Sequence, residues 1–256
     1  MTFSVICVYN NKQILQKNLL SSLEKQNQKY QLILLNNTRH KFKSAAEALN
    51  FGAKKARGKY LMFVHQDVRL EDKNWLAKAT QFLDGLKDLG IAGVVGMSES
   101  GQGNKSRGRN VIKHGEPPAP WSWGNPIKEP EVVQTLDECL LIVPRRVFDK
   151  LQFDEKTCND WHLYGVDYCL SIKKLGFLSY VLPLVIYHQS AGSSFSDRYY
   201  DTLRKLLVKH KDKYKRIYTT MGNWRTFWPF WLQLFLKRAE HFISRGEGWI
   251  KSLRFR

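Results

Sequence analysis

The residues best suited to chemistry in this sequence are His65-Gln66-Asp67, which follow the apolar residues 60–64. The apolar run predicts a buried strand, and ligands of open α/β sheets bind beyond the carboxyl ends of the strands. A carboxylate with a histidine two positions before it suits a divalent cation, which can in turn hold the phosphates of a substrate. The alternative is structural: Asp67 caps the next helix, and His65 hydrogen-bonds a neighbouring loop.

The elements that must position this segment alternate between strand and helix over the first hundred residues. Apolar runs predict strands over residues 4–9, 30–35 and 60–64, and helical periodicity predicts helices over 14–29 and from residue 44. Ser44 and Glu47 have the spacing of a capping box at the start of that second helix. Strands that alternate with helices predict parallel βαβ units and therefore an α/β fold.

The second half of the chain predicts further helices and strands, followed by a C-terminal part that is helical and basic. The patterns indicate helices over 74–89, 145–151 and 161–175, strands over 91–97, 132–143 and 177–187, and an ordered loop or small hairpin over 98–130. From Asp197 onward the chain looks helical and basic. We therefore predict one domain over residues 1–196 and a basic, amphipathic helical tail over 197–256.

Composition favours a soluble protein of the cytosol. The chain has 256 residues, of which 43% are hydrophobic and 25% charged, as in ordinary globular proteins. The four cysteines form no CxxC pair, which indicates a reducing compartment without disulfides or a zinc site. The N-terminus has no secretion signal, and no apolar run reaches the ~18 residues of a membrane span.

The net charge of +18 predicts an anionic partner such as nucleic acid, anionic lipid or a phosphorylated substrate. Residues 201–256 hold 14 Lys and Arg against 4 Asp and Glu, so they carry +10 of that charge. The basic character is therefore concentrated in the predicted tail.

The segment that leads to Asp67 resembles family 2 glycosyltransferases of the GT-A fold. Asn50, Gly52, Ala56 and Gly58 match the family's helix of the form N-x-G-x-x-x-A-x-G, which precedes a strand that ends in a metal-binding D-x-D motif. The variant His-Gln-Asp is similar to the subgroup named after a streptomycin-biosynthesis protein. The opening strand, with Val5-Ile-Cys-Val-Tyr-Asn, is similar to the family's first strand, and the resemblance extends from about residue 3 to residue 195.

This resemblance implies a GT-A (Rossmann-like), mostly parallel sheet flanked by helices, here with a basic helical extension. It implies inverting transfer of a sugar from a nucleotide-sugar donor to a glycan or glycolipid acceptor. Mn²⁺ or Mg²⁺ would bridge the diphosphate and stabilise its developing charge. Asp67 is then the best candidate metal ligand, and His188, at the end of the last strand, fits a third ligand, although a histidine there also suits a purely structural role.

The resemblance also implies a set of residues near the donor. Asn36 and Asn37 stand where the family often has acids that contact the base or ribose, so the nucleotide stays open, and both also suit a simple turn. Asp137 is expected to approach the donor sugar or the acceptor, whereas Glu138 reads equally well as a solvated strand-edge charge. The predicted donor-binding residues are Val8, Tyr9, Asn10, Asn36, Asn37, Ala45, Asn50, His65, Gln66 and Asp137.

Inverting transfer needs a general base that takes the proton of the acceptor hydroxyl. Residues 159–170 align with the family's E-D-x-D-L helix start, but Tyr164 and Gly165 stand where Glu and Asp usually lie. Asp167 is therefore the first choice as base. Asp160 and His162 are the alternates. Asp167 also fits a helix N-terminal carboxylate that is favoured only by the helix dipole.

The aromatic-rich residues 223–238, flanked by basic residues, predict an interfacial helix on anionic headgroups. Trp224, Trp228 and Trp231 would be its apolar anchors, and the acceptor would be a lipid-linked glycan or lipopolysaccharide at the inner face of the cell membrane. Alternatively, these aromatics pack back on the domain or form a homodimer contact.

Two other functions compete with an enzyme of surface-polysaccharide synthesis. The basic, aromatic tail could bind nucleic acid by phosphate contact and base stacking, but no recognisable nucleic-acid module is present, so we expect no such partner. A GT-A domain that binds nucleotide sugar without turnover is the other alternative, because residues 164 and 165 lack the usual acids.

Overall fold

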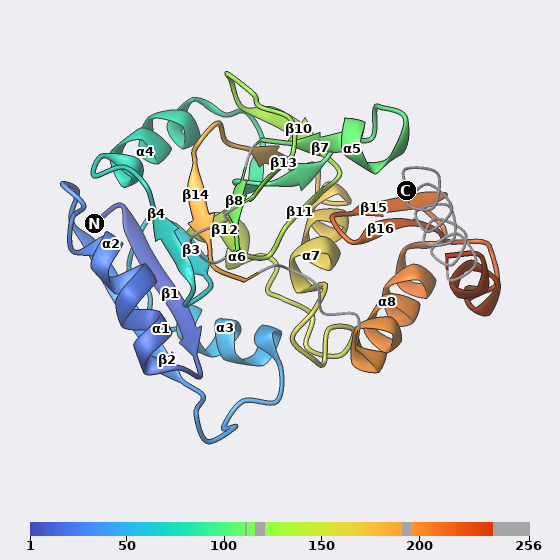
Figure 1. Ribbon diagram of the computed structural model, residues 1–256, viewed down its shortest axis with the longest axis horizontal. Coiled ribbons are helices and arrows are strands. Elements are labelled where there is room, and N and C mark those ends of the chain that lie inside the picture. Colours follow the sequence, from blue (N-terminus) through green and yellow to red (C-terminus); the bar gives the residue numbers. More distant parts are fainter. Residues whose placement is uncertain (111, 116–120, 191–195, 238–256) are drawn as a thin grey trace, which may run out of the picture.

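The computed structural model describes residues 1–237 except 111, 116–120 and 191–195. Its centre is a seven-stranded sheet with the order β10-β13-β5-β12-β3-β1-β2 (Figure 1). These strands are β1 (Phe3–Tyr9), β2 (Tyr30–Asn36), β3 (Tyr60–Val64), β5 (Leu89–Gly93), β10 (Glu131–Val133), β12 (Leu140–Pro144) and β13 (Leu178–Val181).

The sheet is mixed. β1 pairs in parallel with β2 and β3, and β13 pairs in parallel with β5. β12 runs antiparallel between β3 and β5, and β10 runs antiparallel to β13 at the edge. Five strands therefore share one direction and two are reversed, so the predicted α/β sheet flanked by helices is confirmed in its coarse form.

Helices cover both faces of this sheet, which is why its strands are apolar on both sides. Met62 and Val64 of β3 belong to the core under α1 (Lys12–Leu15), η1 (Gln16–Leu20), α2 (Ser21–Leu23) and α4 (Trp75–Gly85). Leu61 and Phe63 belong to the core under α3 (Ala45–Ala53), α6 (Arg145–Phe148) and α7 (Tyr164–Lys173). Alternate side chains of β3 therefore belong to two hydrophobic cores, one on each face of the sheet.

The start of α3 follows the predicted capping pattern in part. The Ser44 hydroxyl accepts the Glu47 backbone N–H at 3.2 Å, as an N-cap does. The Glu47 carboxylate accepts the Lys43 N–H at 2.8 Å instead of the Ser44 N–H of a capping box. Helix α3 is therefore anchored where the sequence predicts it.

Several predicted boundaries are wrong because polar residues or proline interrupt the apolar runs. The predicted helix over 74–89 ends at Gly85, and Leu89 already belongs to β5. The predicted strand over 132–143 divides into β10, β11 (Thr135–Leu136) and β12 around the polar Asp137-Glu138 pair. The predicted strand over 177–187 divides at Pro183 into β13 and β14 (Ile186–His188), because proline removes a ladder hydrogen bond.

Strand β14 leaves the main sheet and enters a second one with the order β4-β14-β8-β9. It runs antiparallel to β4 (Val68–Leu70) and parallel to β8 (Ile112–His114), which pairs with β9 (Trp121–Trp123). A third small sheet joins β11, β6 (Gly96–Met97) and β7 (Gly108–Arg109) beside α5 (Gly103–Arg107). The predicted loop or hairpin over 98–130 is therefore ordered structure in its described part.

The chain after residue 196 packs on the domain. Helix α8 (Asp197–His210) is followed by a hairpin of β15 (Arg216–Thr219) and β16 (Gly222–Arg225), and residues 230–237 are helical. Leu203, Leu206, Ile217 and Trp224 share a core with Leu170 of α7, and Figure 1 shows α7, α8 and the hairpin together at the right. The prediction of helix from Asp197 onward is wrong for the hairpin, and residues 238–256 of the predicted tail lie outside the described residues.

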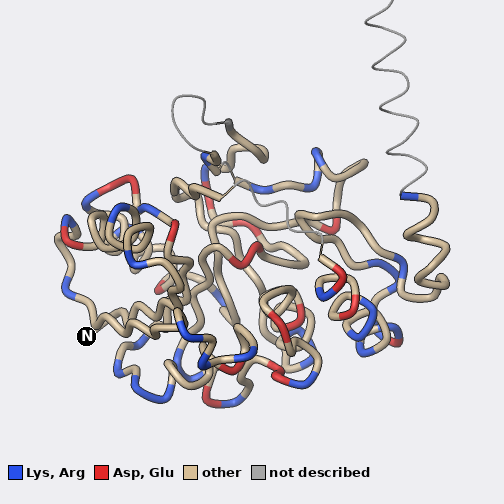
Figure 2. The backbone as a smooth tube through the Cα atoms, turned by 60° about the horizontal axis from the view of Figure 1, so that its bottom comes forward, with Lys and Arg blue, Asp and Glu red and all other residues tan. Residues whose placement is uncertain are grey.

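Burial of Trp224 corrects part of the membrane prediction. This side chain is only 1% exposed, so it packs on the domain instead of anchoring in lipid. Within the described part of the chain, no helix has both the length and the apolar character needed to cross a bilayer. Lys and Arg occur in all parts of the described backbone, interspersed with Asp and Glu (Figure 2).

Candidate functional site

A cleft of about 480 Å³ opens at the carboxyl ends of β1 and β3 and reaches the start of α7 and the tip of the β15–β16 hairpin. This is the position where open α/β sheets bind ligands. The predicted site residues that line it are Val8, Tyr9, Asn10, Asn37, Ala45, His65, Gln66, Asp67, Asp137, His162 and His188.

One corner of the cleft gathers two imidazoles and a carboxylate. The ligand atoms of His65, Asp67 and His188 all lie within 4.8 Å of one another, and His188 Nε2 is 3.4 Å from Asp67 Oδ2. Two histidines and one carboxylate suit a first-row transition ion such as Mn²⁺ better than Mg²⁺, which prefers oxygen ligands. The residues present therefore fit a divalent cation, and we call this group the cation corner.

Electrostatics prepares two of these three groups to bind a cation. Burial opposes ionisation of Asp67, but the hydrogen bond and charge of His188 lower its pKa to about 2. Burial and repulsion from His188 lower the pKa of His65, which keeps its imidazole neutral. Burial lowers the pKa of His188 but Asp67 raises it by more, so a cation would replace a proton there.

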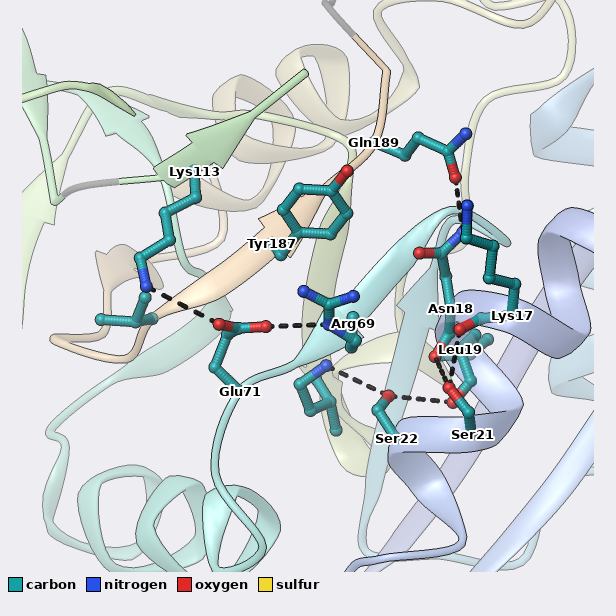
Figure 3. A network of polar contacts seen from close by, with 12 residues as sticks. Lys17, Asn18, Leu19, Ser21, Ser22, Arg69, Glu71, Lys113, Tyr187 and Gln189 are labelled. Atoms are coloured by element: carbon teal, nitrogen blue, oxygen red, sulfur yellow. Dashed lines mark hydrogen bonds and ion pairs between the residues drawn. The ribbon is translucent and has the colours of Figure 1, made fainter. Parts of the chain in front are cut away.

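Polar contacts hold β14, and hence His188, in place (Figure 3). Gln189, next to His188, accepts a hydrogen bond from the Asn18 amide of η1 at 2.7 Å. On the other side, the Arg69 guanidinium lies 4.4 Å above the Tyr187 ring and donates to Glu71 at 2.9 Å. Both neighbours of His188 are thus fixed by residues of other elements, which limits the freedom of its imidazole.

Gln66 joins the end of β1 to the turn after β3. Its side-chain oxygen accepts the N–H groups of Asn10 and Asn11 at 3.1 and 3.0 Å, and its amide donates to Asn10 Oδ1 at 2.7 Å. Gln66 and Asn10 therefore hold the end of β1 and the turn after β3 together in the cleft, next to Asp67.

Two neighbouring carboxylates, Asp137 and Glu138, line the far wall of the cleft. Asp137 accepts the Cys139 N–H at 3.1 Å and the Thr220 hydroxyl at 2.9 Å. Burial opposes its ionisation, yet the charge of His188 and these hydrogen bonds lower its pKa. Glu138 accepts the Gly165 N–H at 2.9 Å, and burial raises its pKa to about 8. Glu138 is a part-buried residue of the cleft and not a solvated strand edge.

The structure argues against Asp167 as the general base. Its carboxylate is 2.7 Å from Lys209 Nζ and 2.8 Å from His210 Nε2, both on α8, and the residue is only 2% exposed. Helix α8 covers this side of α7, so Asp167 faces a buried ion cluster and stands apart from the described residues that line the cleft. This geometry does not support Asp167 as the base, and its carboxylate is engaged by Lys209 and His210 in addition to any effect of the helix dipole.

Of the two alternates, only His162 lines the cleft. Burial lowers its pKa, so its imidazole is neutral. Asp160 is buried 3.6 Å from Arg198, and its backbone carbonyl accepts the Ala45 N–H at the start of α3. Asp160 therefore connects α3 to the loop before α7.

Three predicted donor contacts are engaged in local structure. The Asn36 side chain accepts the N–H and hydroxyl of Thr38, so it forms a turn. Asn50 is buried against Phe153 and Glu155 outside the cleft lining of the described chain. Asn37 lines the cleft but exchanges hydrogen bonds with the Phe42 backbone.

Other cleft residues escaped prediction. The Tyr164 hydroxyl is 3.3 Å from His65 Nε2 and donates to the Glu138 carbonyl at 3.3 Å, so it connects the two walls. His114 of β8 lies with its ring centroid 5.5 Å from that of His188. The hairpin tip contributes Thr219, Thr220 and Met221. Local sequence patterns do not indicate that the β15–β16 hairpin or β8 reaches the cleft, because long-range packing brings both there.

With this geometry established, comparison with known proteins identifies the family. The model of a glycosyltransferase-like family matches residues 4–211, and the chain belongs to that family. The match includes all of α8, which lies beyond the predicted domain end at residue 196. A protein called "ATP synthase subunits region ORF 6" from Fuscovulum blasticum is 26% identical over 167 residues, which are 63% of this chain and 62% of the relative. The chain thus matches less than two thirds of that relative's length.

Solved glycosyltransferase structures share the fold at low identity. GalNAc-T7 with UDP, GalNAc and Mn²⁺ has a TM-score of 0.58 at 14% identity, over 81% of this chain and 48% of the other. The mannosyltransferase PcManGT of Pyrobaculum calidifontis with GDP-Man and Mn²⁺ has 0.57 at 13%, over 83% and 65%. TarS of S. aureus (residues 1–349) with UDP-GlcNAc has 0.53 at 18%, over 82% and 66%. The fold is therefore that of GT-A glycosyltransferases.

Proposed function

We propose that this protein is a metal-dependent, inverting glycosyltransferase that moves a sugar from a nucleotide-sugar donor to a glycan or glycolipid acceptor. The observation that carries the proposal is the cation corner, formed by His65, Asp67 and His188 at the carboxyl end of β3 in a member of this family. A divalent cation bound there would stabilise the charge of a departing nucleoside diphosphate as a Lewis acid.

The remaining cleft residues divide between the two substrates. Val8, Tyr9 and Asn10 at the end of β1 lie where a nucleotide would enter beside the cation corner. Asp137, Glu138 and the hairpin tip form the opposite wall, where we place the transferred sugar and the acceptor. The nucleotide sugars in the structures of TarS and PcManGT support this substrate class.

An exposed aromatic surface supports a membrane-bound acceptor. Phe227, Trp231 and Phe235 are 62%, 70% and 64% exposed. Trp231 and Phe235 are four residues apart within the helical residues 230–237, so they lie on one face of that helix. Such a face suits the headgroup region of an anionic bilayer. We place the enzyme at the inner face of the cell membrane, in the synthesis of lipopolysaccharide or another surface polysaccharide.

A ligand screen tests the donor. The intact protein is heated with UDP-GlcNAc, UDP-GalNAc or GDP-Man, with and without Mn²⁺, and its melting temperature is recorded. A ligand that binds the native state raises that temperature, and we expect one nucleotide sugar to do so only with Mn²⁺. Stabilisation without turnover would favour the non-catalytic alternative. No response to any nucleotide sugar in a broad panel, with or without Mn²⁺, would contradict the proposal.

A vesicle assay tests the membrane contact. We expect the protein to co-sediment with vesicles that contain about 30% anionic lipid, and the variant Trp231→Ser/Phe235→Ser to lose most of this binding. Val208→Ser is the matched control, because Val208 is an apolar residue that is 63% exposed on a different helix, α8. Equal loss in the control, or no loss in the double variant, would exclude this surface as the membrane contact.

A further inference from the structure

We propose that Glu138 is the general base of the transfer and that its carboxyl group takes the place of the acids that residues 164 and 165 lack. This inference depends on the proposed function, because it names the residue that accepts the proton of the acceptor hydroxyl. It also explains how a chain with Tyr164 and Gly165 at the start of α7 retains a carboxylate in the cleft.

The space around Gly165 supports this assignment. A Cβ atom at this position would lie 3.0 Å from Glu138 Cγ and 2.9 Å from Leu141 Cδ1, both closer than ordinary contacts. The Gly165 N–H donates to Glu138 Oε1 at 2.9 Å. The Glu138 side chain therefore occupies the volume that a side chain at residue 165 would fill, and glycine is the residue that allows it.

Position relative to the cation corner also favours Glu138. The Tyr164 hydroxyl contacts both His65 Nε2 and the backbone carbonyl of Glu138. The Tyr164 side chain therefore spans the distance between His65 of the cation corner and residue 138 on the opposite wall of the cleft. Asp167 lies behind α7 in its ion cluster with Lys209 and His210. Of Asp160, Asp167 and Glu138, only Glu138 lines the cleft, next to Asp137 on the same wall.

The environments of the two adjacent carboxylates separate their roles. Asp137 receives hydrogen bonds from Cys139 and Thr220 and has a lowered pKa, so it is a weak base. Burial raises the pKa of Glu138 to about 8, which is close to the working range of a general base. The charge of Asp137 is a smaller contribution to that same rise. The other titratable groups coupled to Glu138 by charge have raised pKa values and are neutral: Cys158, Tyr164, Cys169 and Tyr199.

The proposed step is a single displacement with a balanced proton transfer. The acceptor hydroxyl oxygen forms a bond to the anomeric carbon while its proton moves to the Glu138 carboxylate. The bond between the anomeric carbon and the diphosphate breaks, and its electron pair stays on the leaving phosphate oxygen. The products are the glycoside, the nucleoside diphosphate and protonated Glu138, which returns its proton to solvent.

The decisive variant is Glu138→Gln, which keeps an oxygen for the Gly165 N–H but is not basic. With the donor identified by the screen, Mn²⁺ and water as acceptor, we expect the rate of nucleoside diphosphate release to fall by at least about 100-fold. The Kd of the donor, measured by calorimetry, stays within about threefold, because the carboxyl group acts only on the acceptor. A variant that keeps more than about a third of the wild-type rate would overturn the proposal.

Two controls separate catalysis from structure. Glu131→Gln removes an exposed carboxylate that pairs with Arg109 at the sheet edge, and it keeps the wild-type rate. His162→Gln tests the alternate candidate for the base that lines the cleft. If His162→Gln lost the activity that we expect Glu138→Gln to lose, and Glu138→Gln stayed fully active, His162 would be the base instead.

Moving the carboxylate provides a rescue experiment that does not depend on the stability of Glu138→Gln. Glu138→Ala vacates the space beside residue 165, and adding Gly165→Asp then places an acid at the start of α7. We expect the double variant to recover at least about tenfold of the lost rate. If the double variant folds and binds the donor but does not recover activity, the idea that the Glu138 carboxyl group replaces an acid at residue 165 would be contradicted.

The proposed function and the role of Glu138 fail in distinguishable ways. If the wild-type protein neither binds nor turns over any nucleotide sugar, the glycosyltransferase proposal itself fails. If the wild-type protein turns over its donor and Glu138→Gln does so equally well, only the assignment of the base fails.

Discussion

Asp67 and Asp167 are two aspartates of similar chemistry with different surroundings. Each lies near a histidine nitrogen, at 3.4 Å from His188 for Asp67 and at 2.8 Å from His210 for Asp167. The Asp67 side chain is 17% exposed and faces the cleft, whereas the Asp167 side chain is 3% exposed beneath α8. The same residue type is thus available to a ligand in one place and enclosed in the other.

The difference lies in what covers each carboxylate. Lys209 reaches Asp167 at 2.7 Å and also Asp154 at 2.8 Å, so its ammonium group already pairs with both carboxylates. At Asp67 the nearby groups are imidazoles, which can exchange a proton for a metal ion. The place of a carboxylate in a sequence motif therefore does not establish that it is catalytic, because basic residues of a neighbouring helix can pair with it and bury it.

The first and largest expected effect is at the cation corner. Asp67→Asn removes the ionised ligand, and we expect turnover to fall by about 10³-fold, since a metal ion contributes several kcal/mol to such a transition state. The Mn²⁺-dependent rise in melting temperature disappears as well. Asp72→Asn, which breaks a surface pair with Lys78, is the control. Unchanged Mn²⁺ stabilisation in Asp67→Asn would contradict the assignment.

The second prediction concerns pH and the far wall of the cleft. Because only ionised Glu138 accepts a proton and its pKa is raised to about 8, turnover at saturating Mn²⁺ is low in acid and rises as pH increases through that pKa. Between about pH 6 and about pH 8 the ionised fraction grows about 50-fold, and turnover follows. Glu138→Gln removes this rise. A wild-type profile that stays flat over this interval would exclude Glu138 as the titrating base.

The third prediction separates stability from activity at Asp167. Asp167→Asn removes the carboxylate that faces His210 and leaves Lys209 with Asp154 alone, and we expect a loss of about 2–3 kcal/mol in the free energy of unfolding. Turnover per folded molecule changes by less than about threefold. Denaturant unfolding and single-temperature kinetics measure the two effects. A large loss of turnover with unchanged stability would restore Asp167 as a catalytic candidate.

The smallest expected effect concerns the β15–β16 hairpin. It tests whether the hairpin contributes to substrate binding or only packs over the domain, as α8 packs over Asp167. Thr220→Val removes the hydroxyl that donates to Asp137, and we expect KM for donor or acceptor to rise about tenfold, because a hydrogen bond to a charged group contributes about 1.5 kcal/mol. Thr220→Ser restores the wild-type value. Thr226→Val, which removes a hydroxyl bonded to the Tyr214 carbonyl, serves as the control. Identical KM values in Thr220→Val and wild type would show that the contact is only structural.

Much of the main domain could be predicted from local patterns. The first three strands, the Ser44 N-cap and the apolar run before Asp67 stand where the sequence places them. Hydrophobic runs between polar turns determine these elements: β3 is buried on both faces, and β1 is buried over its first five residues. The boundaries failed where a short polar pair or a proline divides a run, as at Asp137-Glu138 and Pro183.

The sequence by itself determined the strand that presents His65 and Asp67, since both the apolar run and the polar residues after it are contiguous. Only the tertiary structure decided that His188 meets them, that Glu138 fills the space beside Gly165 and that α8 encloses Asp167. These contacts join residues far apart in the chain. Whether a side chain lines a cleft or lies in a core depends on which element packs over it, and local periodicity carries no information about that element.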